Sequence, residues 1–124
     1  MKFFAGCFCA LLLCAGVSIV EAQEPDARIV FATLDKVTAR IGSLEVAVGD
    51  TAQFGTLKIH PRYCRKNPPE ERAEVFAFVE IFEDDGSGNE IFSGWMFASS
   101  PGLNALEHPV YDIWVTDCKT QLSR

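Results

Sequence analysis

The chain has 124 residues with 11 basic and 17 acidic side chains, which gives a formal net charge of −6. This acidic balance disfavours nucleic acids and anionic membrane surfaces as partners, because both recruit basic patches. About a hundred residues remain after a predicted leader. That length is typical of one domain and leaves no room for a second.

Residues 1–22 have the pattern of a secretory signal peptide. Lys2 precedes an uncharged, mainly apolar run, and small residues, Val20 and Ala22, stand three and one positions before the expected cut. Cleavage would leave Gln23 first. An uncleaved inner-membrane anchor is the alternative, because the run reaches the roughly 17–25 residues that span a bilayer. Either interpretation predicts export to the periplasm, and cleavage would leave no membrane span.

Two cysteines, Cys64 and Cys118, lie outside this leader. A single pair in an oxidising compartment is usually a disulfide. Closing a loop of this length would remove about 4 kcal/mol of unfolded-state entropy. We expect a structural role, because no C-x-x-C pair and no spare thiol could exchange with it. Two buried free thiols are the alternative.

The remaining chain divides into three segments. The first is polar at its start and contains Pro25, so we expect a lead-in without regular structure. The predicted segments are the lead-in at 23–34, one all-β domain with the disulfide at 35–119, and a C-terminal tail at 120–124.

Alternation of apolar and polar residues predicts the first strands. It covers residues 37–41 and 44–48, with a glycine-serine pair as the break between them. A third run, 54–64, contains Pro61, which favours a sheet edge or a strand break. The next segment, 65–72, holds two consecutive prolines and is predicted as a solvated loop, although its basic residues could form a docking patch.

The second half of the chain contains the strongest apolar runs. Residues 73–82 are apolar on both alternating sets, so we expect a central strand covered on both faces. A polar turn at 84–89 and the run at 91–97 predict a hairpin. Residues 101–107 suggest one short helical turn, and 111–118 the last strand. The fold class is therefore all-β, a sandwich or barrel-like domain of about six to eight antiparallel strands.

Metal sites are disfavoured by residue spacing. Asp85, Ser87 and Asn89 fall at the first positions of a calcium loop, but Met96 stands where a bidentate glutamate is needed. His60 and Cys64 are four residues apart, which in an extended strand is roughly 13 Å, too far to share a zinc ion. We expect no metal and no cofactor.

A hydrolase triad could be drawn from Ser99 or Ser100 with His108 and Asp112. The extended chain after His108 would hold the carboxylate away from its imidazole, and no G-x-S-x-G elbow is present. We therefore assign no catalytic residue.

Aromatic residues concentrate in the C-terminal half. Trp95, Tyr111 and Trp114, with His108, are the candidate binding residues, since tryptophan and tyrosine are enriched at interaction hot spots and can stack on sugars. Aromatics at strand spacing also occur in cores, so burial decides between the two roles.

Two segments carry a family resemblance: Cys64-Arg65-Lys66 and residues 92–101, Phe-Ser-Gly-Trp-Met-Phe-Ala-Ser-Ser-Pro. With them, the chain resembles a family of small exported alphaproteobacterial proteins of unknown function. The resemblance extends over nearly all of the mature chain and implies an envelope location. It implies no activity, cofactor or catalytic residue.

These observations favour a periplasmic, non-enzymatic interaction or accessory protein of the cell envelope, with another envelope protein as its partner. A small-ligand or glycan-binding module that uses the C-terminal aromatics is the first alternative. A hydrolytic enzyme is the second. The oligomeric state is left open.

Overall fold

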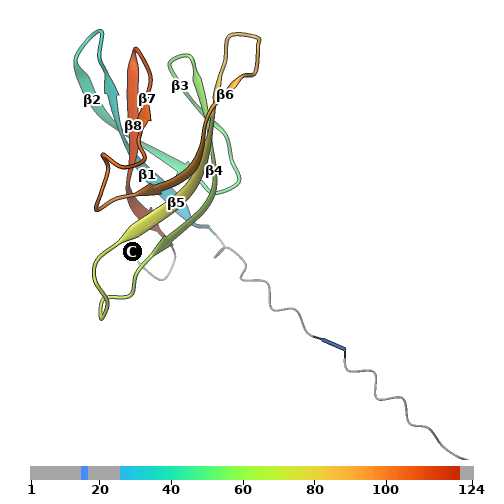
Figure 1. Cartoon of the computed structure of the whole chain (residues 1–124), viewed down its shortest axis with the longest axis vertical. Coiled ribbons are helices and arrows are strands. Elements are labelled where there is room, and N and C mark those ends of the chain that lie inside the picture. Colours follow the sequence, from blue (N-terminus) through green and yellow to red (C-terminus); the bar gives the residue numbers. More distant parts are fainter. Residues whose placement is uncertain (1–14, 17–25, 121–124) are drawn as a thin grey trace, which may run out of the picture.

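Two four-stranded antiparallel sheets pack face to face in the computed structural model, which describes residues 15–16 and 26–120 (Figure 1). The first sheet has the order β2-β1-β8-β7 and the second β3-β4-β5-β6. The strands are β1 (Arg28–Asp35), β2 (Arg40–Ala47), β3 (Ala52–Phe54), β4 (Leu57–Lys66), β5 (Val75–Glu83), β6 (Glu90–Phe97), β7 (Leu106–Glu107) and β8 (Tyr111–Lys119). The predicted all-β sandwich is thus confirmed.

The first hairpin differs from its prediction. β1 begins at Arg28, inside the predicted lead-in, and the predicted strand at 37–41 is wrong because its first three residues belong to the β1–β2 turn. Asp35 explains the turn, since its Oδ1 accepts hydrogen bonds from the Val37 N–H at 2.9 Å and the Thr38 N–H at 3.2 Å. A side chain that bonds the next backbone groups favours a turn over continued alternation.

The predicted break at Gly42 and Ser43 is also wrong, because both residues lie inside β2, paired with β1. The sequence before Asp35 carried the missed signal. Ile29, Phe31 and Thr33 alternate as the inward face of β1 and are at most 3% exposed.

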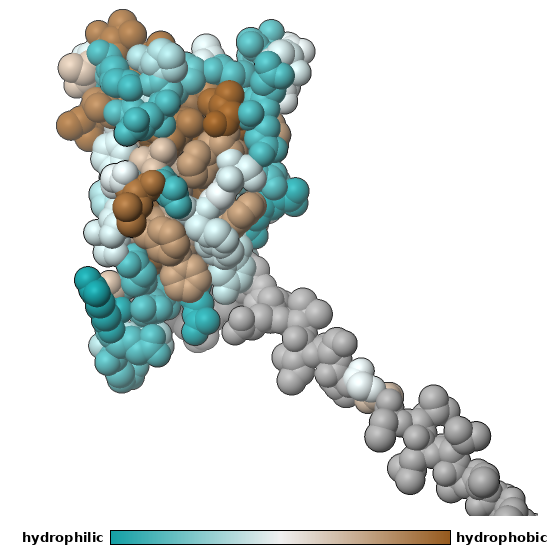
Figure 2. All heavy atoms as spheres, in the orientation of Figure 1, coloured by the Kyte–Doolittle hydropathy of each residue, from teal (hydrophilic) through white to brown (hydrophobic). Residues whose placement is uncertain are grey.

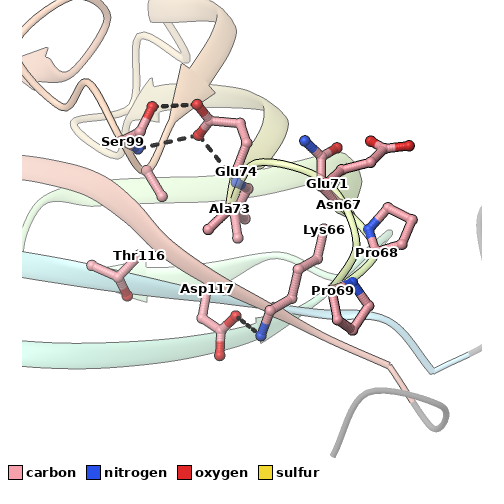
Figure 3. Close-up of a pocket in the computed structure, with 12 residues that line it drawn as sticks. Lys66, Asn67, Pro68, Pro69, Glu71, Ala73, Glu74, Ser99, Thr116 and Asp117 are labelled. Atoms are coloured by element: carbon pink, nitrogen blue, oxygen red, sulfur yellow. Dashed lines mark hydrogen bonds and ion pairs between the residues drawn. The ribbon is translucent and has the colours of Figure 1, made fainter.

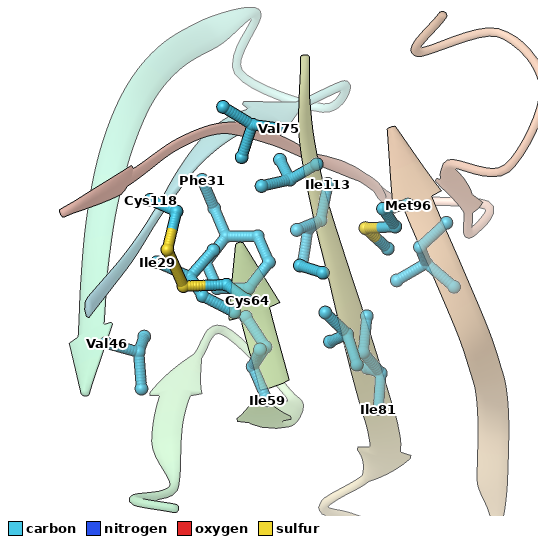
Figure 4. Close-up of a cluster of buried hydrophobic side chains, with 14 of the residues drawn as sticks. Ile29, Phe31, Val46, Ile59, Cys64, Val75, Ile81, Met96, Ile113 and Cys118 are labelled. Carbon is cyan, nitrogen blue, oxygen red and sulfur yellow. A yellow bond between two sulfur atoms is a disulfide. The ribbon is translucent and has the colours of Figure 1, made fainter. Parts of the chain in front are cut away.

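The disulfide between Cys64 and Cys118 is present, with 6.0 Å between the two Cα atoms (Figure 4). It joins β4 of the second sheet to β8 of the first, and both cysteines are buried among the apolar side chains that fill the space between the sheets. The predicted structural bond is therefore confirmed as a link between the two layers.

Pro61 lies within β4, where the strand is paired on one side only. β3 covers only Leu57–Ile59 of β4, and the pairing with β5 shifts by a bulge between Pro61 and Tyr63. The Pro61 carbonyl accepts the Gly49 N–H at 2.9 Å, so the backbone of Pro61 faces the side of β4 that β3 does not cover, where a residue without an N–H is tolerated.

The hairpin predicted around residues 84–89 is confirmed as β5–β6. The region 101–107 contains a turn, closed by the Leu103 N–H bonding the Ser100 carbonyl at 3.0 Å, and then the short strand β7. β8 confirms the last predicted strand.

The prediction that both faces of the strand at 73–82 are covered is wrong. Along β5 every second residue from Val75 to Ile81 is buried, whereas the alternate residues are only partly buried. The two sheets use all eight strands, so no described strand remains to form a third layer over the outer face of the second sheet. This face is the subject of the next section.

No helix of the described residues is long and apolar enough to cross a membrane. The predicted signal peptide falls outside those residues, apart from 15–16.

Candidate functional site

Aromatic side chains gather on the outer face of the second sheet. Cross-strand pairing places Tyr63 of β4 beside Phe78 of β5, and Phe78 beside Trp95 of β6. Phe76 stands one step along β5 on the same face. We call Tyr63, Phe76, Phe78 and Trp95 the aromatic face. Figure 2 shows apolar side chains over this part of the molecule, with hydrophilic groups above and below them.

Trp95 is the centre of the aromatic face. Its ring centroid lies 5.3 Å from that of Phe78, 5.8 Å from Tyr63 and 6.0 Å from Phe76. Trp95 is 41% exposed, although tryptophan side chains are highly buried on average. The three neighbours hold its ring in place, so a partner would meet a pre-ordered side chain with little rotamer entropy left to lose.

The ring planes of the aromatic face do not form a flat row. Trp95 meets both Tyr63 and Phe78 at an interplanar angle of 76°. Edge-to-face contacts are a preferred geometry of packed aromatic pairs. The cluster is therefore well packed around Trp95, as the tryptophan and tyrosine anchors of protein interfaces are.

An ion pair lies at one side of the aromatic face. The Arg62 Nε donates to Glu80 Oε1 at 3.1 Å, and the Arg62 side chain is 57% exposed. Glu80 is paired with Ser93 across the β5–β6 ladder. The surface therefore combines an apolar centre with a polar border, the usual anatomy of a binding patch.

The second predicted tryptophan, Trp114, lies elsewhere. Its neighbours in β8, Ile113 and Val115, are at most 1% exposed and face the core, so Trp114 points away from the core on the first sheet. Trp95 and Trp114 therefore stand on opposite outer faces of the sandwich and cannot form one site.

Tyr111 and His108 do come together, near the end of the sandwich opposite the disulfide. Their rings stack with centroids 5.6 Å apart, and Tyr111 meets Phe54 edge-on at 5.1 Å. His108 Nδ1 accepts the Val110 N–H at 3.1 Å, so Nε2 carries the proton of the neutral ring and donates to Glu83 at 2.6 Å. These contacts tie the second sheet to the first, which is a structural role.

Gly55 is required beside Tyr111. It has a φ of +57°, and a Cβ on it would stand 2.2 Å from the Tyr111 hydroxyl oxygen. Tyr111, Phe54 and Gly55 line one wall of a cavity of about 350 Å³ whose other wall includes Asp35 and Arg40. The cavity is small, and the Tyr111 ring is already in contact with the rings of Phe54 and His108.

The β7–β8 pairing folds the chain back at His108, but the side chains of the triad candidates bond groups outside the triad. The Ser99 hydroxyl and N–H both bond the carboxylate of Glu74, which lowers the pKa of Glu74 below its ordinary value of 4.5. His108 bonds Glu83, and Asp112 forms an ion pair with the Lys36 ammonium at 2.9 Å. Each group thus has a partner outside the proposed triad.

A cleft of about 620 Å³ opens between the β4–β5 loop and β8 (Figure 3). Pro68 and Pro69 form one wall, and Lys66, which pairs with Asp117 at 3.0 Å, crosses its floor. The Lys66 and Asp117 charges neutralise one another, and the other charged residues of the lining, Glu71 and Glu74, are acidic.

The described part of the chain holds no group of three or more histidine, cysteine, aspartate or glutamate side chains that could bind a metal ion. In the former calcium candidate, Asp85 Oδ1 accepts the Ser87 N–H at 2.9 Å and also the Ser87 hydroxyl, which lowers the pKa of Asp85. The Asp85 carboxylate is therefore engaged in hydrogen bonds within its own turn.

Sequence reasoning missed Tyr63, Phe76 and Phe78 as site residues. The signal was present in the apolar run at 73–82, which has large residues on both alternating sets. A chain of this length folds into two layers, so a run that is apolar on both sides leaves one side uncovered. An uncovered apolar face of this kind usually marks an interaction site.

Residues 29–118 match the family described as "Uncharacterized protein conserved in bacteria (DUF2155)". The chain is also 32% identical over 87 residues to the uncharacterized protein RP359 of Rickettsia prowazekii, an alphaproteobacterium. That match covers 68% of this chain and 56% of the relative's own length. No solved structure matches the chain.

Proposed function

We propose that this chain, which belongs to the DUF2155 family of uncharacterized bacterial proteins, is a non-enzymatic interaction module of the cell envelope that binds another protein through its aromatic face. The observation that carries this proposal is Trp95, 41% exposed yet held by three aromatic neighbours. Tryptophan is one of the residues most enriched at binding hot spots.

Two further features support the envelope part of the proposal. The buried bond between Cys64 and Cys118 fits an oxidising compartment, where such bonds form and persist. The signal-peptide pattern at residues 1–22 fits export to the periplasm.

The test compares two tryptophans with opposite positions. Trp95→Ala removes the centre of the aromatic face, whereas Trp114→Ala makes the same chemical change on the other sheet. Wild type and both variants would be cross-linked in the envelope of the producing bacterium, solubilised and affinity purified. We expect wild type and Trp114→Ala to retain one specific protein. Trp95→Ala should lose most of it, because loss of a hot-spot residue weakens binding by about 30-fold.

Thermal unfolding of each variant would confirm that all three are folded. Equal recovery with Trp95→Ala and wild type would contradict the proposal, as would the absence of any specific protein. Titration with peptidoglycan fragments provides the remaining comparison. A shift of Trp95 emission in a Trp114→Phe background would favour the glycan-binding alternative instead.

A further inference from the structure

β6 forms one edge of the second sheet, and among the described strands only β5 pairs with it (Figure 1). The Ala98 N–H bonds the Val75 carbonyl at 2.9 Å, which fixes the alternation of the antiparallel ladder. Residues 92, 94 and 96 therefore direct their backbone groups toward β5. Ser93, Trp95 and Phe97 direct theirs outward, away from the sheet.

These outward groups are available for pairing. Among the described hydrogen bonds, only the one from the Ser100 N–H to the Phe97 carbonyl uses an outward group of β6. Ser93 and Trp95 are both exposed residues. The outward backbone and the aromatic face thus share Trp95, so a strand added at this edge would place alternate side chains beside the Trp95 ring.

β6 also lacks the features that protect other sheet edges. Natural edge strands are usually blocked by lysine, proline, other charges or short length. β3 and β7 are three and two residues long, and β2 carries Arg40 and Glu45. β6 has eight residues, and its one charge is Glu90 at the start. An edge strand without such protection suggests that the protein uses it to pair with a strand of a partner.

Charge indicates what kind of strand would pair. Residues 73–118 contain no lysine or arginine. Several of their carboxylates pair with cations outside this segment, namely Glu80, Asp84, Asp112 and Asp117, but none of the described ion pairs includes Glu74, Asp85 or Glu90. Asp85 lies in the turn before β6, Glu90 is the first residue of β6, and Glu74 lies beside the end of β6, bonded to Ser99. A second copy of the chain would bring like charges together, whereas a basic segment would be attracted.

We infer that the partner binds as an extended basic segment, a strand that adds to the edge of β6 and continues the second sheet. Its alternate residues are apolar and contact Trp95, and lysine or arginine residues at its ends face Glu90 and Glu74. The inference rests on the proposed function, because it assigns the partner of the same aromatic face. The added main-chain hydrogen bonds supply affinity and the apolar positions supply specificity.

The experiment uses Ser93→Pro with Ser93→Ala as its control. Proline removes the outward N–H and the serine hydroxyl and donates nothing toward β5 at this position, so the ladder to β5 keeps its hydrogen bonds. Alanine removes the hydroxyl alone. A library of random ten-residue peptides displayed on phage would be selected on the oxidised wild-type protein. We expect the enriched peptides to carry alternate apolar residues between basic ends, and to bind wild type and Ser93→Ala equally.

Ser93→Pro should weaken these peptides by about tenfold or more, the effect of one or two lost hydrogen bonds. Backbone N-methylation of the peptide at alternate residues should do the same on the wild-type protein, which keeps the test decisive even if Ser93→Pro fails to fold. Hydrogen exchange of the Ser93 and Trp95 amides should slow in the complex.

Equal binding by Ser93→Pro, enrichment of acidic peptides, or no enrichment at all would overturn the inference. So would a wild-type dimer that Ser93→Pro converts to a monomer, since the occupant of β6 would then be a second copy. If Ser93→Pro keeps the envelope partner that Trp95→Ala loses, strand addition fails and the proposed function stands. If Trp95→Ala loses nothing, the proposed function itself fails.

Discussion

The inner and outer faces of β5 are both apolar, yet they carry side chains of different size. The inner face has Val75, Ala77, Val79 and Ile81, each at most 6% exposed. The outer face has Phe76, Phe78 and Phe82, which remain partly exposed. If burial alone governed placement, the larger phenylalanines would stand inside, because they have more apolar area to remove from water. The aliphatic inner residues instead match the close packing around Phe31 and the disulfide, and the outer phenylalanines lie on the face through which we propose that the protein binds its partner.

Removal of the disulfide is the most severe test of the inner face. Cys118→Ser should lower stability by about 4 kcal/mol under oxidising conditions, because the bond closes a loop with a sequence separation of 54. For a domain of this size the midpoint of thermal unfolding should fall by roughly 15–30 °C. Calorimetry of the oxidised proteins measures it.

Reduced wild type is the control for this variant, and its midpoint should approach that of Cys118→Ser. An unchanged midpoint in the oxidised variant would show that the bond between β4 and β8 contributes nothing to the packing of the two layers.

A matched pair of substitutions separates the two faces of β5. Ile81→Ala on the inner face should cost about 2–5 kcal/mol, because it leaves a cavity between the sheets. Phe78→Ala on the outer face should cost only about 1 kcal/mol, since Phe78 is partly exposed and loses mainly its contact with Trp95. Denaturant unfolding gives both values.

Partner capture should follow the opposite order. Phe78→Ala should reduce recovery of the envelope partner while remaining folded, and Ile81→Ala should retain the partner wherever it stays folded. Equal stability losses at both positions would contradict the distinction between a packed face and a binding face.

The smallest expected effect concerns the contact between Glu74, just before β5, and Ser99, just after β6. The Ser99 hydroxyl lowers the pKa of Glu74 below its ordinary value of 4.5, so this contact stabilises the folded state above that pH and is lost as the pH falls through the lower folded-state pKa. Ser99→Ala should therefore destabilise the protein slightly at neutral pH and not at all in strong acid.

Ser100→Ala is the matched control for this pH test, because it keeps the Ser100 backbone bond to Phe97 and leaves Glu74 untouched. Unfolding midpoints measured from neutral to acidic pH should show a difference that shrinks for Ser99→Ala alone. A constant difference across this range would mean that Glu74 does not depend on Ser99.

Much of the fold could be predicted because its signals are local. The β5–β6 hairpin follows from a polar turn between two apolar runs, and the last strand from its alternation. The β1–β2 hairpin could not be placed in the same way. Its turn forms because the Asp35 side chain accepts hydrogen bonds from the backbone that follows it. The alternation of apolar and polar residues continues on both sides of this turn and so does not mark its position.

The candidate site was predicted only in part. Trp95 is selected by its residue type, and the predicted β5–β6 hairpin brings Phe78 beside it. No local pattern indicates that β4 pairs with β5, which adds Tyr63, or that this side of the hairpin is left uncovered. Trp114 has the same chemistry and lies on the opposite layer. Residue type selected the two tryptophans equally, and only the sheet order separates them.

The sequence by itself determined the all-β class and the bond between Cys64 and Cys118, because period-two alternation and an even cysteine pair are properties of the chain. The tertiary structure decided which side of the run at 73–82 is packed and which is left open. The physical reason is that alternation assigns residues to two faces, whereas the second layer that covers one of them comes from β1 and β8, far away in sequence.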